Sequence, residues 1–136
     1  MPGFSKSERV SSKLIINALF AKGNFSLYEN PFRFSWVFVE PNLSACQVLI
    51  VSSKKKLKTS VERNRQKRQL RELYRLNKNA LLDSLVENQL YIAVSINYIG
   101  IEPIKLVPLS PIFKNALLKI ARAAKKNSAV SLPAAH

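Results

Sequence analysis

The sequence is poor in the residues that build covalent or metal-bound frameworks. It has one cysteine, Cys46, and one histidine, His136, among 136 residues. A lone cysteine cannot form an internal disulfide, and a lone histidine cannot supply the pair that a two-histidine ribonuclease mechanism needs. Cys46 lies among apolar residues, which favours a small buried hydrophobe over a reactive thiol. These shortages exclude a disulfide scaffold and a Cys/His metal site.

Acidic residues and long apolar runs are also scarce. The 8 Asp and Glu residues form no cluster of the kind that holds two catalytic metal ions. No Gly-rich phosphate loop is present. No run reaches the roughly 18 apolar residues of a membrane-spanning helix, and residues 1–13 lack the apolar core of a secretory signal. We therefore expect a cytoplasmic protein that binds no membrane and has no catalytic or metal-binding group of its own.

Positive charge is abundant. The chain has 22 Lys and Arg residues and a formal net charge of +14, while 47% of its residues are hydrophobic, as in a globular domain. Such an imbalance opposes the compact state through self-repulsion, so it indicates that the natural partner is a polyanion.

The hydrophobic pattern predicts one α+β domain over residues 1–125 and a disordered tail over residues 126–136. We expect three helices and a small, mostly antiparallel sheet of about four strands, in the order α-β-β-(β)-α-β-α. The expected helices cover residues 11–23, a stretch from 59 to 88 that Asn77 and Asn79 bend or end, and a last helix opening at Ser110 and Pro111. The clearest strands are residues 32–40, 46–53 and 90–100, with a loop before the first of them.

Most of the charge gathers on the long middle helix and just before it. Residues 54–75 hold ten Lys or Arg against Glu62 and Glu72, a net charge of +8. At about 100° per residue, Arg63, Asn64, Lys67, Arg68, Arg71 and Arg75 share an arc of roughly 140°. Leu70, Leu73 and Leu76 gather opposite, and Arg65 lies outside the arc. A solvated helix face is the ordinary alternative, but the absence of acids from this arc favours an RNA-binding surface. Glu62 and Glu72 are expected to offset neighbouring cations and not to bind metal.

The run SSKKKLKTSVERNRQKRQLRELYRL, residues 52–76, is similar to the signature of the bacterial ribonuclease P protein subunit family. That signature has Arg-Asn-Arg, a spacer, Lys-Arg, two further residues and Arg-Glu, after a lysine-rich strand end. Ile50 and Lys58 stand where many members have Gly. The matching residues are Arg63, Asn64, Arg65, Lys67, Arg68, Arg71 and Glu72, with Lys55 and Lys56 upstream.

The resemblance implies a fold like the second domain of ribosomal protein S5 and a role in tRNA processing. Family members act with a catalytic RNA that removes the 5′ leader of precursor tRNA by Mg²⁺-dependent hydrolysis. The protein itself then binds no cofactor and requires no protein partner. The expected contacts to the catalytic RNA are Arg63, Asn64, Arg65, Lys67, Arg68, Arg71 and Arg75 on the helix, with Lys54, Lys55, Lys56 and Lys58 at the strand end.

The resemblance also implies a cleft between the first helix and the sheet that binds the single-stranded leader. Phe20, Phe34, Trp36 and Phe38 are the candidate stacking residues for that cleft. An aromatic stripe on a strand is more often core, and this alternative stays open. Two other classes also remain possible: a stand-alone basic binder, such as a ribosomal or DNA-packing protein, and an autonomous nuclease, which the missing catalytic residues disfavour.

Overall fold

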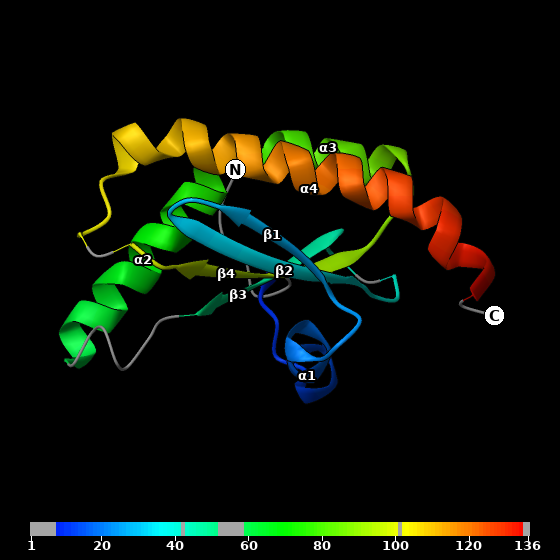
Figure 1. Ribbon diagram of the computed structural model, residues 1–136, viewed down its shortest axis with the longest axis horizontal. Helices are drawn as coiled ribbons and strands as arrows, with labels where there is room; N and C mark the ends of the chain where they lie inside the picture. Colours follow the sequence, from blue (N-terminus) through cyan, green and yellow to red (C-terminus); the bar gives the residue numbers. More distant parts are fainter. Residues whose placement is uncertain (1–7, 42, 52–58, 101, 135–136) are drawn as a thin grey trace.

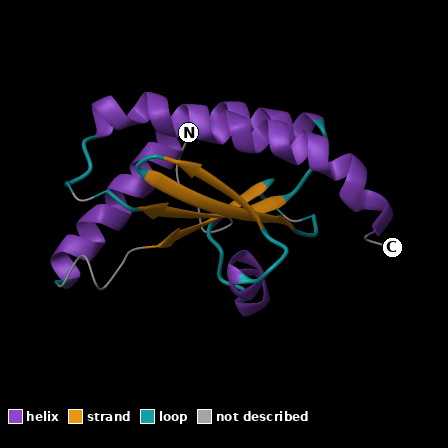
Figure 2. Ribbon diagram, in the orientation of Figure 1, coloured by secondary structure: helices purple, strands orange, loops and turns teal. Residues whose placement is uncertain are grey.

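Four strands form a single mixed sheet in the order β1-β2-β4-β3 (Figure 2). The computed structural model describes residues 8–41, 43–51, 59–100 and 102–134, with side chains described as far as residue 128. β1 pairs antiparallel with β2, β2 antiparallel with β4, and β3 parallel with β4. The strands are β1 (Phe25–Glu29), β2 (Phe32–Phe38), β3 (Cys46–Val51) and β4 (Ile92–Tyr98).

Helices cover both faces of this sheet (Figure 1). A parallel pair of strands needs a crossover connection, and α2 (Ser60–Asn77) and α3 (Asn79–Glu87) form the one between β3 and β4. These two helices and α4 (Leu106–Ala134) lie on one face, while α1 (Lys13–Phe20) packs alone against the other. None of the described helices is long and apolar enough to cross a membrane.

The helix-covered face, which we call the closed face, holds the main core. Phe32, Phe34 and Trp36 alternate along β2 on this side and are buried with Ile92, Val94, Ile96 and Tyr98 of β4. Phe113 of α4 contacts the rings of Phe32 and Phe34 at centroid distances of 5.2 and 5.6 Å. Large rings fill the space between sheet and helix, so this layer carries most of the apolar burial.

The opposite face, which we call the open face, has smaller and more polar residues. The alternate positions of β2 and β4 point this way, and Ser35 and Ser95 are joined by a hydrogen bond between their hydroxyls. Leu19 and Ala93 are the buried centre of a small cluster under α1. Because α1 is only 8 residues long, much of this face is not covered by a helix.

The segment before α1 is anchored to the edge strand β3. The Val10 amide donates to the Val48 carbonyl at 3.1 Å, and Glu8 forms a buried ion pair with Lys78 at 2.8 Å. A buried ion pair of this kind fixes the position of the segment more than it adds net stability, since both charges lose their hydration. The Ser12 hydroxyl then caps α1 by accepting from the Ile15 amide.

Four features of the fold differ from the sequence-based expectation. Residues 25–29 form β1 and not a loop, because Phe25 and Leu27 pair with Trp36 and Phe34 on the closed face. The stretch expected to be helical over 59–88 is divided into α2 and α3 between Asn77 and Asn79, where a bend or an end was expected, so there are four helices and not three among the described residues. α4 begins at Leu106 and not at Ser110, since Pro108 fits a first helical turn, where amides have no intrahelical acceptor. The same helix continues through residues 126–134, which were expected to be disordered.

Candidate nucleic-acid interface

The predicted basic helix is α2, and its local sequence explains where it begins and ends. The Thr59 hydroxyl accepts from the Glu62 amide at 3.2 Å and donates to the Glu62 carboxylate at 3.0 Å. Capping by this pair satisfies amides that lack an intrahelical acceptor. At the other end, the Asn77 side chain donates to the Leu73 carbonyl and to the Ser110 hydroxyl, at 2.8 and 3.0 Å. α2 is therefore held at both ends and joined to α4.

The buried side of α2 is centred on Leu70, Leu73 and Tyr74, each fully buried. Leu76 was expected on this side, but it is 51% exposed, so that expectation was wrong. The spacing of three and four residues, from Leu70 to Leu73 and Tyr74, keeps those three on one helix face, whereas Leu76 falls outside it. Tyr74 lies on the buried side of α2, where the sequence predicted Leu76.

The cations of α2 form two neighbouring rows. Asn64, Arg65 and Arg68 are exposed, while Arg63, Lys67, Arg71 and Arg75 are half-buried along the flank of the helix. Arg65 lines, with Arg68, Gln69, Glu72 and Leu106, a hollow of about 550 Å³. Gln69 closes one side of it by donating to the Ile104 carbonyl at 3.2 Å. We call these seven predicted helix residues together the α2 surface, and Glu72 lies beside Arg65 and Arg68 in it.

The two acids of α2 each have a local partner. Arg75 donates through Nε to both carboxylate oxygens of Glu72 at 3.1 Å. This contact lowers the pKa of Glu72 and raises that of Arg75. Glu62 contacts Thr59 in the N-terminal cap. Glu72 therefore pairs with a cation, as expected, whereas Glu62 belongs to the helix cap. No group of three or more His, Cys, Asp or Glu side chains suited to a metal ion occurs among the described residues.

The strand-end lysines cannot be placed. Lys54, Lys55, Lys56 and Lys58 lie outside the described residues, between the end of β3 and the start of α2. Their assignment as RNA contacts stays a prediction.

The predicted aromatic cleft needs a correction. Phe34 and Trp36 are 0% and 1% exposed and lie on the closed face, away from α1, so they offer no free ring for stacking. Phe38 is half-buried and forms a T-shaped contact with Trp36, with ring centroids 5.4 Å apart. The physical reason is the apolar face of α4, which covers these rings. Phe20, at the end of α1, is 60% exposed and lines a hollow beside α1, and the half-buried Phe38 lines another.

A polar hollow of about 250 Å³ does lie between α1 and the open face, and we call it the α1 groove. Leu19 and Phe20 of α1 line it, together with Arg33 of β2 and Asn97 of β4. Ser35 and Ser95 line its floor. Asn24, whose side chain donates to the Leu19 carbonyl, closes the end. Asn24, Arg33 and Asn97 were not predicted for this cleft, because they come from three separate segments that only the fold brings together.

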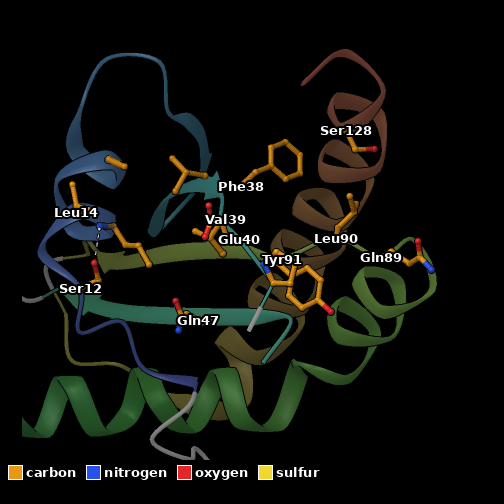
Figure 3. Close-up of a pocket in the computed structure, with 14 residues that line it drawn as sticks. Ser12, Leu14, Phe38, Val39, Glu40, Gln47, Gln89, Leu90, Tyr91 and Ser128 are labelled. Carbon is orange, nitrogen blue, oxygen red and sulfur yellow. Dashed lines mark hydrogen bonds between the residues drawn. The ribbon is translucent and has the colours of Figure 1, made fainter. Parts of the chain in front are cut away.

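A larger hollow of about 870 Å³ lies at the other end of α1 (Figure 3). Leu14 and Ile15 of α1 line it, together with Val37, Val39 and Tyr91. Among the described residues that line this hollow, the charged one is Glu40, and none is Lys or Arg. Its chemistry is apolar and slightly acidic, which suits a polyanion poorly.

A mixed four-stranded sheet between two helix layers, with cations on a crossover helix, defines a small basic α+β domain. The family model for ribonuclease P matches residues 4–97. Two curated proteins named ribonuclease P protein component, from two strains of Porphyromonas gingivalis, are 35% identical over 121 residues, covering 88% of this chain and 87% of theirs. The chain belongs to the ribonuclease P protein family. A solved structure of the Staphylococcus aureus RNase P protein has the same fold, with a TM-score of 0.59 at 20% identity over 88% of this chain and 99% of that one.

Proposed function

We propose that this chain is the protein subunit of a ribonuclease P, and that it binds the catalytic RNA through the α2 surface. The observation that carries the proposal is the concentration of cations there. Asn64, Arg65 and Arg68 are exposed, and the half-buried row beside them adds four more cations. Guanidinium groups bind phosphates through two parallel hydrogen bonds, and an exposed amide adds a directional contact to sugar or base.

The α1 groove is the proposed contact for the 5′ leader of precursor tRNA. Single-stranded RNA is held by aromatic rings that stack on bases and by cations that meet the phosphates. The groove offers Phe20 for the first role and Arg33 for the second. The Ser35 hydroxyl and the Asn97 amide would supply hydrogen-bonding partners for base edges. Phe34 and Trp36 have no part in this proposal.

The chemistry of cleavage is assigned to the RNA. Among the described acids, Glu8, Glu29 and Glu72 are engaged in ion pairs, and no carboxylate set is arranged for metal ions. We propose that Mg²⁺ is bound through the RNA and not by this chain alone. Within the complex, the protein would position the substrate and neutralise phosphate charge.

The test is cleavage of a 5′-extended precursor tRNA at low, near-physiological Mg²⁺. The samples are the purified chain, a bacterial catalytic RNA, and the two together. We expect cleavage from the mixture well above that of the RNA alone, and none from rigorously RNA-free protein. If the mixture were no better than the RNA although the two bind, a stand-alone basic binder would replace the proposal. Cleavage by the protein alone would point to a nuclease.

A further inference from the structure

The outer face of α4 carries a second row of cations that the proposed function does not use. Between Leu106 and Ser128 this helix has five Lys or Arg and no acid. We call these residues the α4 stripe, and all five are exposed: Lys114, Lys119, Arg122, Lys125 and Lys126. An ordinary solvated helix face mixes charges of both signs, so a row of one sign needs its own explanation.

The geometry of α4 makes this row straight and continuous. At about 100° per residue the five side chains fall within an arc of roughly 140°. From Lys114 to Lys126 the row is about 18 Å long, at a rise of about 1.5 Å per residue. The opposite side of the helix packs into the core through Phe113, Leu117 and Ile120. The stripe therefore faces away from the sheet.

Few of these charges are neutralised within the chain. Lys119 forms an ion pair with Glu29 of β1 at 2.7 Å. Over the described part of the chain, the ion pairs found involve none of the other four residues of the stripe. Arg122 has Lys125 and Lys126 three and four residues ahead, where like charges repel along a helix. An external polyanion would relieve this repulsion.

The α4 stripe is separate from the α2 surface. α4 contacts β1 at one edge of the sheet, and α2 contacts β3 at the other edge (Figure 1). The two helices touch each other near Asn77 and Ser110, at the start of α4, while most of the stripe lies farther along the helix. A single short RNA segment on the α2 surface would leave the stripe uncovered.

The side chains of the stripe indicate which kind of polyanion it would bind. Its exposed arc has no aromatic ring, since Phe113 is fully buried, so it offers no platform for unpaired bases. A helix that binds lipid inserts an apolar face, whereas the apolar face of α4 is occupied by the protein core. A-form RNA duplexes present rows of phosphates that proteins contact by shape and charge. We propose that the α4 stripe is a second RNA-binding surface, one that contacts the phosphates of a double-stranded RNA segment.

The test compares three full-length variants with the native chain, using an RNA duplex of about 16 base pairs as the probe. The stripe variant combines Arg122→Gln, Lys125→Gln and Lys126→Gln, and it leaves the Lys119 ion pair intact. The matched control removes three exposed cations elsewhere, by Lys13→Gln, Lys22→Gln and Lys105→Gln, so both variants have the same net charge. The third variant, Arg65→Gln with Arg68→Gln, weakens the α2 surface.

We expect the stripe variant to lower the slope of log affinity against log salt by about two to three, since each phosphate contact contributes about 0.9 to that slope in duplex nucleic acid. The matched control should change this slope by less than the contribution of one phosphate contact. Combining the stripe and α2 changes should add their effects. A stripe variant with the native slope would overturn the inference, as would tighter binding to phosphatidylglycerol vesicles than to duplex RNA. If the triple variant does not fold, Lys125→Gln with Lys126→Gln is measured in its place.

Failure of this inference can be distinguished from failure of the proposed function. If the native chain enhances precursor cleavage but the stripe variant keeps the native slope, the second surface is wrong and the subunit assignment stands. If the stripe changes the slope but the native chain gives no enhancement with catalytic RNA, the surface stands and the assignment falls.

Discussion

The two faces of the sheet use the same strands for different purposes. On the closed face, β2 places Phe32, Phe34 and Trp36 under α4, where all three are buried in the core. On the open face the same strand places Arg33 and Ser35 beside the short helix α1. Successive side chains of a strand point to opposite sides, so one residue of register separates core from candidate binding site. An aromatic stripe on a strand therefore does not by itself identify a nucleic-acid-binding surface. Whether its rings are exposed depends on whether a helix covers that face of the sheet.

The largest expected effect comes from opening the closed face. Trp36→Ala should reduce the free energy of unfolding by about 3–5 kcal/mol, because it removes a fully buried ring that Phe25 stacks on. Urea denaturation measures the loss, and Trp36→Phe is the control that keeps most of the volume. A Trp36→Ala protein that kept its stability and lost affinity for leader RNA would place this ring in the binding site.

Phe20→Ala tests the open face. The ring is 60% exposed, so the stability should change little. Affinity for a precursor tRNA with a 5′ leader should fall by about 1–3 kcal/mol, the usual contribution of one stacked base, with no change for mature tRNA. Equilibrium binding to the reconstituted complex measures both. Leu14→Ala, an exposed apolar residue on the same helix, is the matched control. Equal losses for the two tRNAs would argue against a leader contact.

Arg68→Ala should change neither the core of the closed face nor the groove of the open face, since Arg68 is exposed on α2. We expect weaker binding to the catalytic RNA and a salt slope that is smaller by about one phosphate contact. Lys13→Ala removes an exposed cation from α1 and should leave the slope nearly unchanged. Titration at several salt concentrations gives the slopes, and an unchanged slope for Arg68→Ala would remove this residue from the interface.

Cys46 gives the mildest test of the closed face. Burial raises the pKa of its thiol from 9.0 to about 12. Native protein should therefore resist alkylation at about pH 8, whereas urea-unfolded protein should react, because the thiolate is the nucleophile. Rapid alkylation of the native chain would mean that the closed face opens often.

The same pKa difference predicts a loss of stability in alkali. Between the unfolded pKa and about 12, the unfolded thiol of Cys46 loses its proton while the folded one keeps it. The stabilising contribution is complete below the unfolded value and declines as the pH rises through this window. Burial also raises the pKa of Tyr74 and Tyr98, so Cys46→Ala should flatten the decline in part only. Urea denaturation at a series of alkaline pH values measures it.

Local patterns predicted most elements of the fold. The alternation in β2, the apolar run of β3 and the uninterrupted helix-forming stretch of α2 each appear with small boundary changes. β1 was missed because its five residues form a strand only by pairing with β2. The start of α4 was missed since Ser110 and Pro111 resemble a helix start, although Lys105 already accepts the first hydrogen bond, from the Leu109 amide.

The candidate site divides in the same way. The charge of α2 and its amphipathic spacing are properties of consecutive residues, and the sequence by itself determined them, together with the family. Other features depend on contacts between segments far apart in the chain. These are the burial of the aromatic rings, the meeting of Arg33 with Asn97, and the separation of the α4 cations from α2. Only the tertiary structure decided these points. The physical reason is that burial belongs to a pair of packed surfaces, and one strand cannot specify which of its faces a distant helix will cover.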